Sequence, residues 1–180
     1  LDLSCFEIIG SGGAQEDQSV SRYIQSLGIV SLSLYGATET MGAVGYSAPD
    51  KLRAGSVGCI GSWNQVLISD EGEVLIKGSN IMTGYFGDEE ATNKALSGGW
   101  FHTGDKGYID KDGFLYITGR LKNTIILSNG ENVNPEFIES RLSSCEAIQE
   151  VLVSGEDDIL VAYLYCSGPE VDLKDKAKEY

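Results

Sequence analysis

The sequence predicts an α/β protein in which a parallel βαβ layer is joined to an antiparallel β-subdomain and followed by a small α+β region. Three observations support this prediction. Residues 4–34 read as strand, helix and strand, and residues 42–120 contain many short apolar runs separated by glycines. After residue 120 the strand and helix patterns alternate again. A crossover helix is typical of a parallel pair of strands, and tight glycine turns are typical of antiparallel hairpins.

The βαβ unit is predicted at the start of the chain. Residues 4–9 form a short apolar strand candidate, and residues 19–27 carry apolar side chains at helical spacing. Gly28 ends that helix, and residues 28–34 form the next strand. A right-handed parallel crossover brings the ends of both strands to one sheet edge, where ligands of open α/β sheets bind. The glycine cluster at residues 10–14 is either a tight turn or bare backbone that can approach a flat ligand.

The middle of the chain has a sequence pattern typical of antiparallel β-structure. Residues 65–69 and 73–77 are short apolar strand candidates with glycine turns around them. Residues 88–96 predict one short helix, for which Asp88 is a suitable N-cap. Residues 107–118 alternate apolar and polar side chains around a Lys-Asp-Gly turn, which predicts a hairpin.

The last part of the chain returns to mixed structure. A strand is predicted at residues 124–127, and a helix begins at Pro135, since proline suits the first helical turn. Residues 149–153 and 159–165 are further strand candidates. A charged helix is predicted from residue 171.

Composition narrows the function classes. The net charge of −14 disfavours nucleic acid and anionic lipid as partners, because such a field repels polyanions. No apolar run reaches the roughly 18 residues of a membrane span. The four cysteines are far apart, which favours free buried thiols in a reducing compartment such as the cytoplasm over metal binding. The first residues carry no initiator methionine or signal peptide, so we expect an excised fragment.

The turn at residues 34–40 is the strongest local candidate for a nucleotide site. Tyr35 can stack on a base, and Gly36 lets backbone come close. Thr38 can donate to a phosphate oxygen, and Glu39 offers a hard oxygen to Mg²⁺. The alternative is a polar turn that caps a helix starting near Thr38.

Several short motifs occur in an order that resembles the adenylate-forming (AMP-binding) superfamily, and within it most closely the acyl-CoA synthetases and fatty-acid–CoA ligases. The motifs are S-G-G-A (11–14), Y-G-A-T-E (35–39), G-E-V-L-I-K-G (72–78), W-F-H-T-G-D (100–105), Y-I-T-G-R-L-K (116–122) and S-N-G-E-N-V (128–133). The resemblance covers essentially the whole chain. It implies that residues 1–121 are the C-terminal part of the large adenylate-binding domain and that residues 122–180 are the first part of a small α+β C-terminal lid domain.

The resemblance implies a nucleoside site built from matching residues. Gly12, Gly13 and Ala14 would lie along the adenine edge, and Tyr35 would stack against its face. Asp105 would accept hydrogen bonds from both ribose hydroxyls, since a carboxylate can accept from two donors at once.

The resemblance also implies residues for phosphate chemistry and for the lid. Thr38 would contact the α-phosphate, Glu39 would hold Mg²⁺, and Arg120 would reach the ribose or the α-phosphate. Lys122 occupies the position at which the family's lid swivels. Gly130 lies in the loop that lines the pantetheine tunnel.

The activity implied is activation of a carboxylic acid, fatty or aryl, by ATP to an acyl-adenylate, followed by transfer to coenzyme A. The alternatives are an adenylation domain that loads a carrier-protein thiol and a catalytically inactive adenylate-binding module. The family's phosphate loop and its late catalytic lysine do not occur in these residues. We therefore expect the chain alone to bind ATP weakly and to be inactive.

Some residues near these motifs have other expected roles. His102 is expected to be structural, because the chemistry of its motif lies on Asp105. Met41, Ala43 and Val44 are candidates for an acyl pocket or for the core. The chain departs from the family pattern after the hinge position, where Asn123 replaces the usual aspartate and the next loop is one residue longer.

Overall fold

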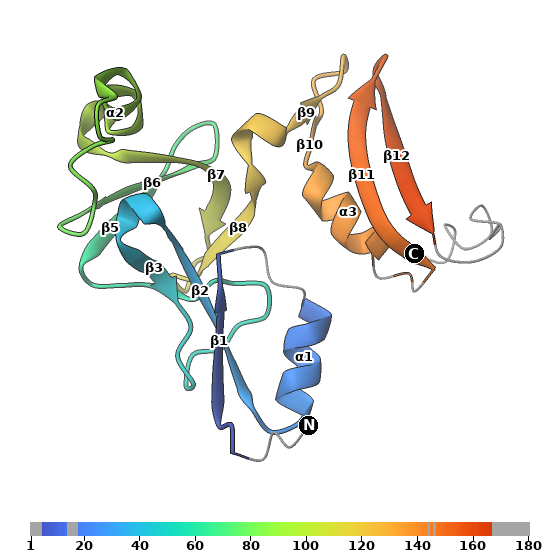
Figure 1. Ribbon diagram of the computed structural model, residues 1–180, viewed down its shortest axis with the longest axis horizontal. Coiled ribbons are helices and arrows are strands. Elements are labelled where there is room, and N and C mark those ends of the chain that lie inside the picture. Colours follow the sequence, from blue (N-terminus) through green and yellow to red (C-terminus); the bar gives the residue numbers. More distant parts are fainter. Residues whose placement is uncertain (1–4, 14–17, 144, 146, 167–180) are drawn as a thin grey trace. The chain divides into compact units, whose positions relative to one another are not determined.

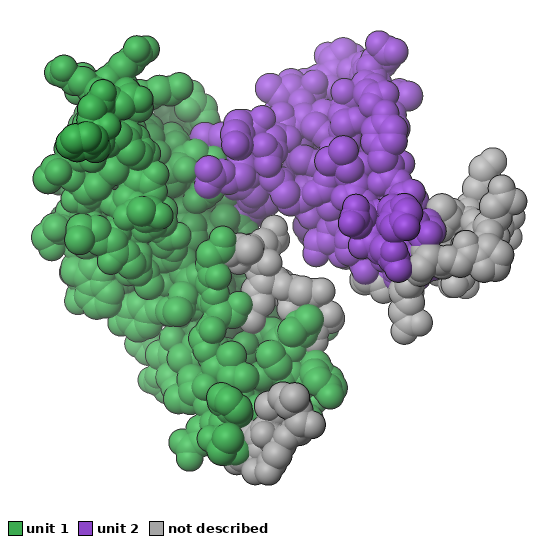
Figure 2. All heavy atoms as spheres, in the orientation of Figure 1, with its two compact units in different colours: residues 1–117 green, residues 118–180 purple. Residues whose placement is uncertain are grey.

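The computed structural model describes residues 5–13, 18–143, 145 and 147–166. The chain divides into two compact units, Leu1–Ile117 and Thr118–Tyr180, which Figure 2 colours separately. The division falls within strand β8 (Leu115–Arg120). None of the helices in the described ranges is long and apolar enough to cross a membrane.

The first sheet of the N-terminal unit has the order β1-β2-β3-β4. Strands β1 and β2 are parallel and are connected through α1, so the predicted βαβ unit is confirmed (Figure 1). Strands β3 and β4 then join the same sheet in antiparallel orientation, so the sheet is mixed rather than a separate parallel layer. The elements are β1 (Ile8–Gly12), α1 (Gln18–Ser26), β2 (Val30–Ala37), β3 (Gly42–Tyr46) and β4 (Cys59–Ile60).

The predicted position of the first strand was wrong by several residues. Strand β1 begins at Ile8 and includes Gly10 and Gly12, which were expected to follow the strand as a turn or a ligand-facing loop. Gly12 lies opposite Leu34 of β2, and a Cβ on Gly12 would come within 2.8 Å of the Leu34 carbonyl oxygen. The glycines therefore extend the strand because the two backbones approach closely, and Gly13 with φ +86° ends it.

The second sheet is the predicted antiparallel β-structure, with the order β5-β6-β7-β8. The short predicted helix is also present as α2, and the side chain of Asp88 caps it by accepting from the Ala91 amide at 2.9 Å. The elements are β5 (Asn64–Ile68), β6 (Glu73–Gly78), α2 (Glu89–Ala95), the 3₁₀ turn η2 (Ser97–Gly99), β7 (Phe101–Ile109) and β8.

The core of the N-terminal unit connects its two sheets. Its buried members come from β3, β6, β7 and β8, and are Val44, Val74, Ile76, Phe101 and Leu115. Burying such side chains stabilises a fold by roughly 1.5–3 kcal/mol each. Because β3 follows the turn at residues 38–40, this core anchors the strand that leaves that turn.

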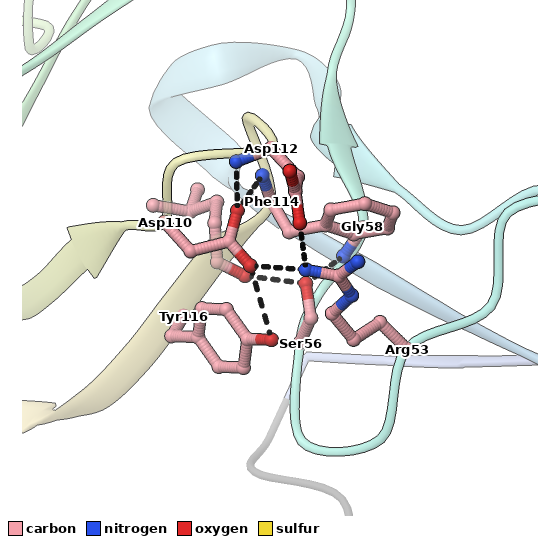
Figure 3. Close-up of polar contacts among 8 residues, drawn as sticks. Arg53, Ser56, Gly58, Asp110, Asp112, Phe114 and Tyr116 are labelled. Carbon is pink, nitrogen blue, oxygen red and sulfur yellow. Dashed lines mark hydrogen bonds and ion pairs between the residues drawn. The ribbon is translucent and has the colours of Figure 1, made fainter.

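An ion-pair cluster fastens the loop before β4 to the β7–β8 hairpin (Figure 3). Arg53 Nη1 donates to Asp110 Oδ2 at 2.7 Å and to Asp112 Oδ2 at 2.8 Å, and its guanidinium lies 4.3 Å from the centre of the Phe114 ring. Asp110 Oδ1 also accepts from the Asp112 and Phe114 amides, which closes the hairpin turn. Ser56 Oγ donates to the Leu115 carbonyl at 2.8 Å. The cluster is structural in character, since Arg53 bridges two carboxylates of the hairpin and Asp110 also closes its turn.

Among its described residues, the C-terminal unit contains one α-helix and two small antiparallel sheets. The predicted helix begins at Pro135, and the two last predicted strands pair as a hairpin. Glu139 Oε1 accepts from the Val153 amide at 2.8 Å and so joins the helix to that hairpin. The predicted helix from residue 171 lies outside the described residues. The elements are η3 (Leu121–Asn123), β9 (Ile125–Ile126), β10 (Asn132–Val133), α3 (Pro135–Ser143), β11 (Ile148–Glu156) and β12 (Ile159–Cys166).

Candidate functional site

Two of the predicted nucleoside-binding residues meet in the structure. Tyr35 lies near the end of β2 and Asp105 lies within β7, 70 residues later. The Tyr35 hydroxyl donates a hydrogen bond to Asp105 Oδ2 at 2.7 Å. Asp105 is buried and Tyr35 is half-buried, so little water competes with this bond. The bond fixes the hydroxyl end of the ring beside the carboxylate.

The segment that carries Asp105 is anchored to β6 by side chains. Thr103 Oγ1 donates to the Val74 carbonyl at 2.7 Å and accepts from the Asp105 amide at 3.0 Å. The carboxylate of Glu73 accepts from the Gly104 amide at 2.8 Å, and its other oxygen lies 2.9 Å from Nδ1 of His102. His102 therefore has the structural environment that was expected. Sequence reasoning missed Glu73, which is buried under this turn.

The turn at residues 38–40 places a hydroxyl and a carboxylate side by side. It forms the 3₁₀ helix η1 (Thr38–Thr40), directly after β2, so the alternative of a turn that opens a helix holds in part. Thr38 is exposed and Glu39 is half-buried. Glu39 Oε1 accepts from the Tyr85 hydroxyl at 2.8 Å, and this hydrogen bond raises the pKa of Tyr85 above its ordinary value.

A buried polar network holds the backbone of this turn. Thr40 is fully buried; its Oγ1 accepts from the Ala37 amide at 2.9 Å and lies 2.7 Å from the Gly42 carbonyl, to which it donates. The side-chain amide of Asn80 donates to the Thr40 carbonyl at 2.7 Å, and Asn64 donates to Asn80 Oδ1 at 2.6 Å. Sequence reasoning missed this network. Its only local signal is a second hydroxyl residue two positions after Thr38 in the turn.

Two of the glycines named as ligand-facing, Gly12 and Gly36, are also needed for close packing of neighbouring strands. A Cβ on Gly36 would come within 2.2 Å of the Gly42 carbonyl oxygen, because β3 crosses close to β2 at a bulge. Gly36 therefore admits a neighbouring strand. Gly12 is the last residue of β1 and pairs with Leu34 of β2, the residue before Tyr35, and Gly13 follows it. Ala14 lies outside the described residues.

The remaining predicted site residues belong to the second unit. Arg120 is the exposed last residue of β8, and Lys122 is exposed in η3. Gly130 is exposed in the loop between β9 and β10 and has φ +82°, a conformation that favours glycine. The contact between Tyr35 and Asp105 lies within the first unit, whereas these three residues belong to the second.

The three candidates for an acyl pocket separate into different environments. Val44 is fully buried and belongs to the core. Met41 is 77% exposed and adopts a left-handed backbone conformation (φ 49°). Ala43 is half-buried between them.

The oxygen donors around Glu39 fit a hard cation that is bound mainly by phosphate oxygens and water and by only one protein carboxylate. Within the described residues, no three His, Cys, Asp or Glu side chains gather into a protein metal cage. Mg²⁺ is commonly held by one or two carboxylates together with phosphate oxygens and water, and Glu39 beside Thr38 supplies such a carboxylate. The four cysteines are free, but only Cys145 is buried, so the expectation of buried thiols was wrong for the other three.

Comparison with known proteins relates both units to one group of enzymes. Residues 122–179 match the family model described as "AMP-binding enzyme C-terminal domain". The long-chain-fatty-acid–CoA ligase FadD15 of Mycobacterium bovis is 37% identical over 160 residues, a match that covers 89% of this chain and 27% of the ligase. The chain therefore spans about a quarter of the length of this relative.

Solved structures give the same relationship. The o-succinylbenzoate CoA synthetase (MenE) of Bacillus subtilis in complex with its acyl-adenylate intermediate superposes with a TM-score of 0.85 at 33% identity, covering 96% of this chain and 39% of the synthetase. The structure of that enzyme with ATP and magnesium ion gives a TM-score of 0.83 at 31% identity, with the same coverage of both chains. The predicted fold class is thereby confirmed.

Proposed function

The chain belongs to the adenylate-forming (AMP-binding) superfamily, and we propose that it is part of an AMP-forming acyl-CoA synthetase. The full-length protein would activate a carboxylic acid with ATP to an acyl-adenylate and transfer the acyl group to coenzyme A. A fatty or aryl acid is the proposed substrate class. It is supported by the loop at residues 128–133, which resembles that of fatty-acyl and aryl-CoA synthetases, and by relatives named for long-chain fatty acids and for succinylbenzoate.

The observation that carries this proposal is the hydrogen bond between Tyr35 and Asp105. It supports a nucleoside site in which the Tyr35 ring stacks on adenine and the Asp105 carboxylate accepts from the ribose hydroxyls. Gly12, Gly13 and Ala14 are proposed for the adenine edge. The pairing of Gly12 with Leu34, the residue before Tyr35, supports that placement for the first two.

The phosphate side of the proposed site is the η1 turn. Thr38 would donate to an α-phosphate oxygen, and Glu39 would hold the Mg²⁺ that accompanies ATP. When bound, Mg²⁺ neutralises negative charge on the phosphates. Arg120 is proposed to contact the ribose or the α-phosphate, since a guanidinium stays charged and binds phosphate in a fixed geometry.

We assign residues 1–121 to the large domain and 122–180 to the beginning of the lid. This assignment is supported by the family match that starts at residue 122. Lys122 is the proposed hinge, and Gly130 is proposed to lie beside the pantetheine arm of coenzyme A. A lid that rotates lets one site serve both adenylation and thiol transfer. The free cysteines support a cytoplasmic location.

The test is a pyrophosphate-release assay of the full-length protein with ATP, Mg²⁺ and a panel of fatty and aryl acids of graded size, with and without coenzyme A. The expected result is pyrophosphate release with some acids and an acyl-CoA product when coenzyme A is present. Adenylate without acyl-CoA would point to a carrier-protein thiol as the acceptor. Absence of pyrophosphate release with every acid would refute the synthetase and support an inactive adenylate-binding module.

A further inference from the structure

Tyr85 is the side chain that holds the proposed magnesium ligand. Its hydroxyl donates to Glu39 Oε1 at 2.8 Å, although 46 residues separate the two in sequence. The same segment also binds the backbone of Glu39, because the Met82 amide donates to the Glu39 carbonyl at 2.8 Å. Glu39 is thus held at its carbonyl and at its carboxylate by one short stretch of chain.

Tyr85 is itself fixed on the surface by a local turn. Its amide donates to Thr92 Oγ1 at 2.9 Å, and the same oxygen donates to the Asp88 carbonyl at 2.7 Å. Gly84 packs against Thr92 so closely that a Cβ there would lie 2.7 Å from a Thr92 methyl carbon. Tyr85 is 39% exposed, and its backbone is held by the hydrogen bond of its amide to Thr92 and by the close packing of Gly84.

We propose that Tyr85 is a positioning residue: its phenol holds the Glu39 carboxylate in one orientation, so that Oε2 is presented to the divalent cation that accompanies ATP. The inference rests on the proposed function, since it takes Glu39 as the cation ligand. A neutral donor suits this role. It orients a metal-binding carboxylate without adding a positive charge, and such supporting hydrogen bonds typically change metal affinity about 10–100-fold.

The test measures cation binding directly in the full-length protein. Mn²⁺ serves as a paramagnetic substitute for Mg²⁺, and its binding is followed by electron paramagnetic resonance in the presence of a saturating non-hydrolysable ATP analogue. Tyr85→Phe is expected to weaken Mn²⁺ binding about 10–100-fold. Its affinity for the analogue without metal should be unchanged. The matched control is Tyr46→Phe, which removes a hydroxyl from a tyrosine that stacks on Trp63 in the same unit and should leave Mn²⁺ binding unchanged.

Two further variants separate positioning from general damage. In a Glu39→Gln background, Tyr85→Phe should cause no further loss of Mn²⁺ affinity, because the two residues act through one contact. Thr92→Ala loosens the turn but keeps the phenol, and should give a smaller loss of Mn²⁺ affinity than Tyr85→Phe. Wild-type Mn²⁺ affinity in Tyr85→Phe, or an undiminished effect in the Glu39→Gln background, would overturn the inference alone. Failure of the wild-type protein to bind the analogue would instead refute the proposed function.

Discussion

The Tyr35 hydroxyl donates to Asp105 Oδ2 at 2.7 Å, which connects the end of β2 to the middle of β7. Replacing Tyr35 by Phe removes the donor and leaves a buried carboxylate oxygen without it. We expect the free energy of unfolding to fall by about 1–3 kcal/mol. AMP affinity of the full-length protein should fall about tenfold, the equivalent of roughly 1.4 kcal/mol. Urea unfolding and calorimetric titration with AMP measure the two effects.

Tyr23→Phe is the control for this substitution, because the Tyr23 ring is 66% exposed on α1. It should change neither quantity beyond about 0.5 kcal/mol. Unchanged AMP binding in Tyr35→Phe, with Tyr23→Phe behaving as the wild type, would contradict the placement of Asp105 in a nucleoside site.

Substitution of the two threonines of η1 should affect different properties: Thr40 should affect stability, and Thr38 should affect pyrophosphate release. Thr40→Val leaves the Ala37 amide and the Gly42 carbonyl without their buried partner, and should lower the free energy of unfolding by about 2–4 kcal/mol. Thr38 is exposed, so Thr38→Val should change stability by less than about 0.5 kcal/mol. Thr38→Val should nevertheless slow pyrophosphate release in the full-length protein. Denaturation curves and the release assay together distinguish these outcomes, and a large stability loss in Thr38→Val would be inconsistent with them.

Local sequence patterns were sufficient for most elements of the fold. Helices α1, α2 and α3 begin within one residue of their predicted starts, because apolar periodicity and capping residues act locally. The two last predicted strands are also present, although β11 extends three residues beyond its predicted end. The start of β1 was misplaced, since the reason for its glycines is the close approach of Leu34, which belongs to another strand. The joining of β3 to the parallel pair was missed for the same reason: pairing partners are set by tertiary structure.

The residues of the candidate site also divide into those that local motifs identify and those that depend on tertiary contacts. Motif residues such as Tyr35 and Asp105 could be named from sequence, and their contact follows from the fold. Glu73, Thr40 and Tyr85 could not, because they act through partners that lie far away in sequence or through backbone groups that no side-chain pattern reveals. Supporting residues of this kind carry no composition or spacing signal of their own.

The buried carboxylate of Glu73 should control the shape of the Asp105 segment. Glu73→Ala removes the acceptor of the Gly104 amide and the partner of His102, and should lower the free energy of unfolding by about 1–3 kcal/mol. AMP affinity of the full-length protein should fall as well, since Gly104, which loses its hydrogen bond, directly precedes Asp105. Chemical denaturation and AMP titration test both.

Glu73→Gln retains an oxygen acceptor for the Gly104 amide and should recover part of the loss. The exposed neighbour Glu71 provides the control, because Glu71→Ala removes the same charge from the turn without a buried contact. Equal effects of Glu71→Ala and Glu73→Ala would show that charge, and not the buried hydrogen bonds, is responsible.

The Arg53 cluster should make part of the stability depend on acid pH. Partial burial acts to raise the pKa of Asp110, but hydrogen bonds from the Phe114 amide, the Arg53 guanidinium and the Asp112 amide outweigh it and hold the pKa below the ordinary 3.8. A depressed carboxyl pKa contributes stability that is present above its unfolded value and is lost as the pH falls through its folded value. This contribution is therefore complete at pH 7, and it is lost below pH 3.8 as the pH falls through the lower pKa of the folded state.

Arg53→Met tests this dependence, because it removes the guanidinium and keeps an apolar side chain of similar length near Phe114. The variant should be less stable than the wild type at pH 7, and the difference should narrow as the pH falls below 3.8 and through the lower pKa that Asp110 has in the folded wild type. Urea unfolding of the chain at pH 7 and at about pH 3 measures this change. Lys51→Met, which removes an exposed cation from the same loop, should show a small difference that does not depend on pH in this way. A constant gap between Arg53→Met and the wild type at both pH values would mean that packing on Phe114, and not the carboxylates, accounts for the contribution of Arg53.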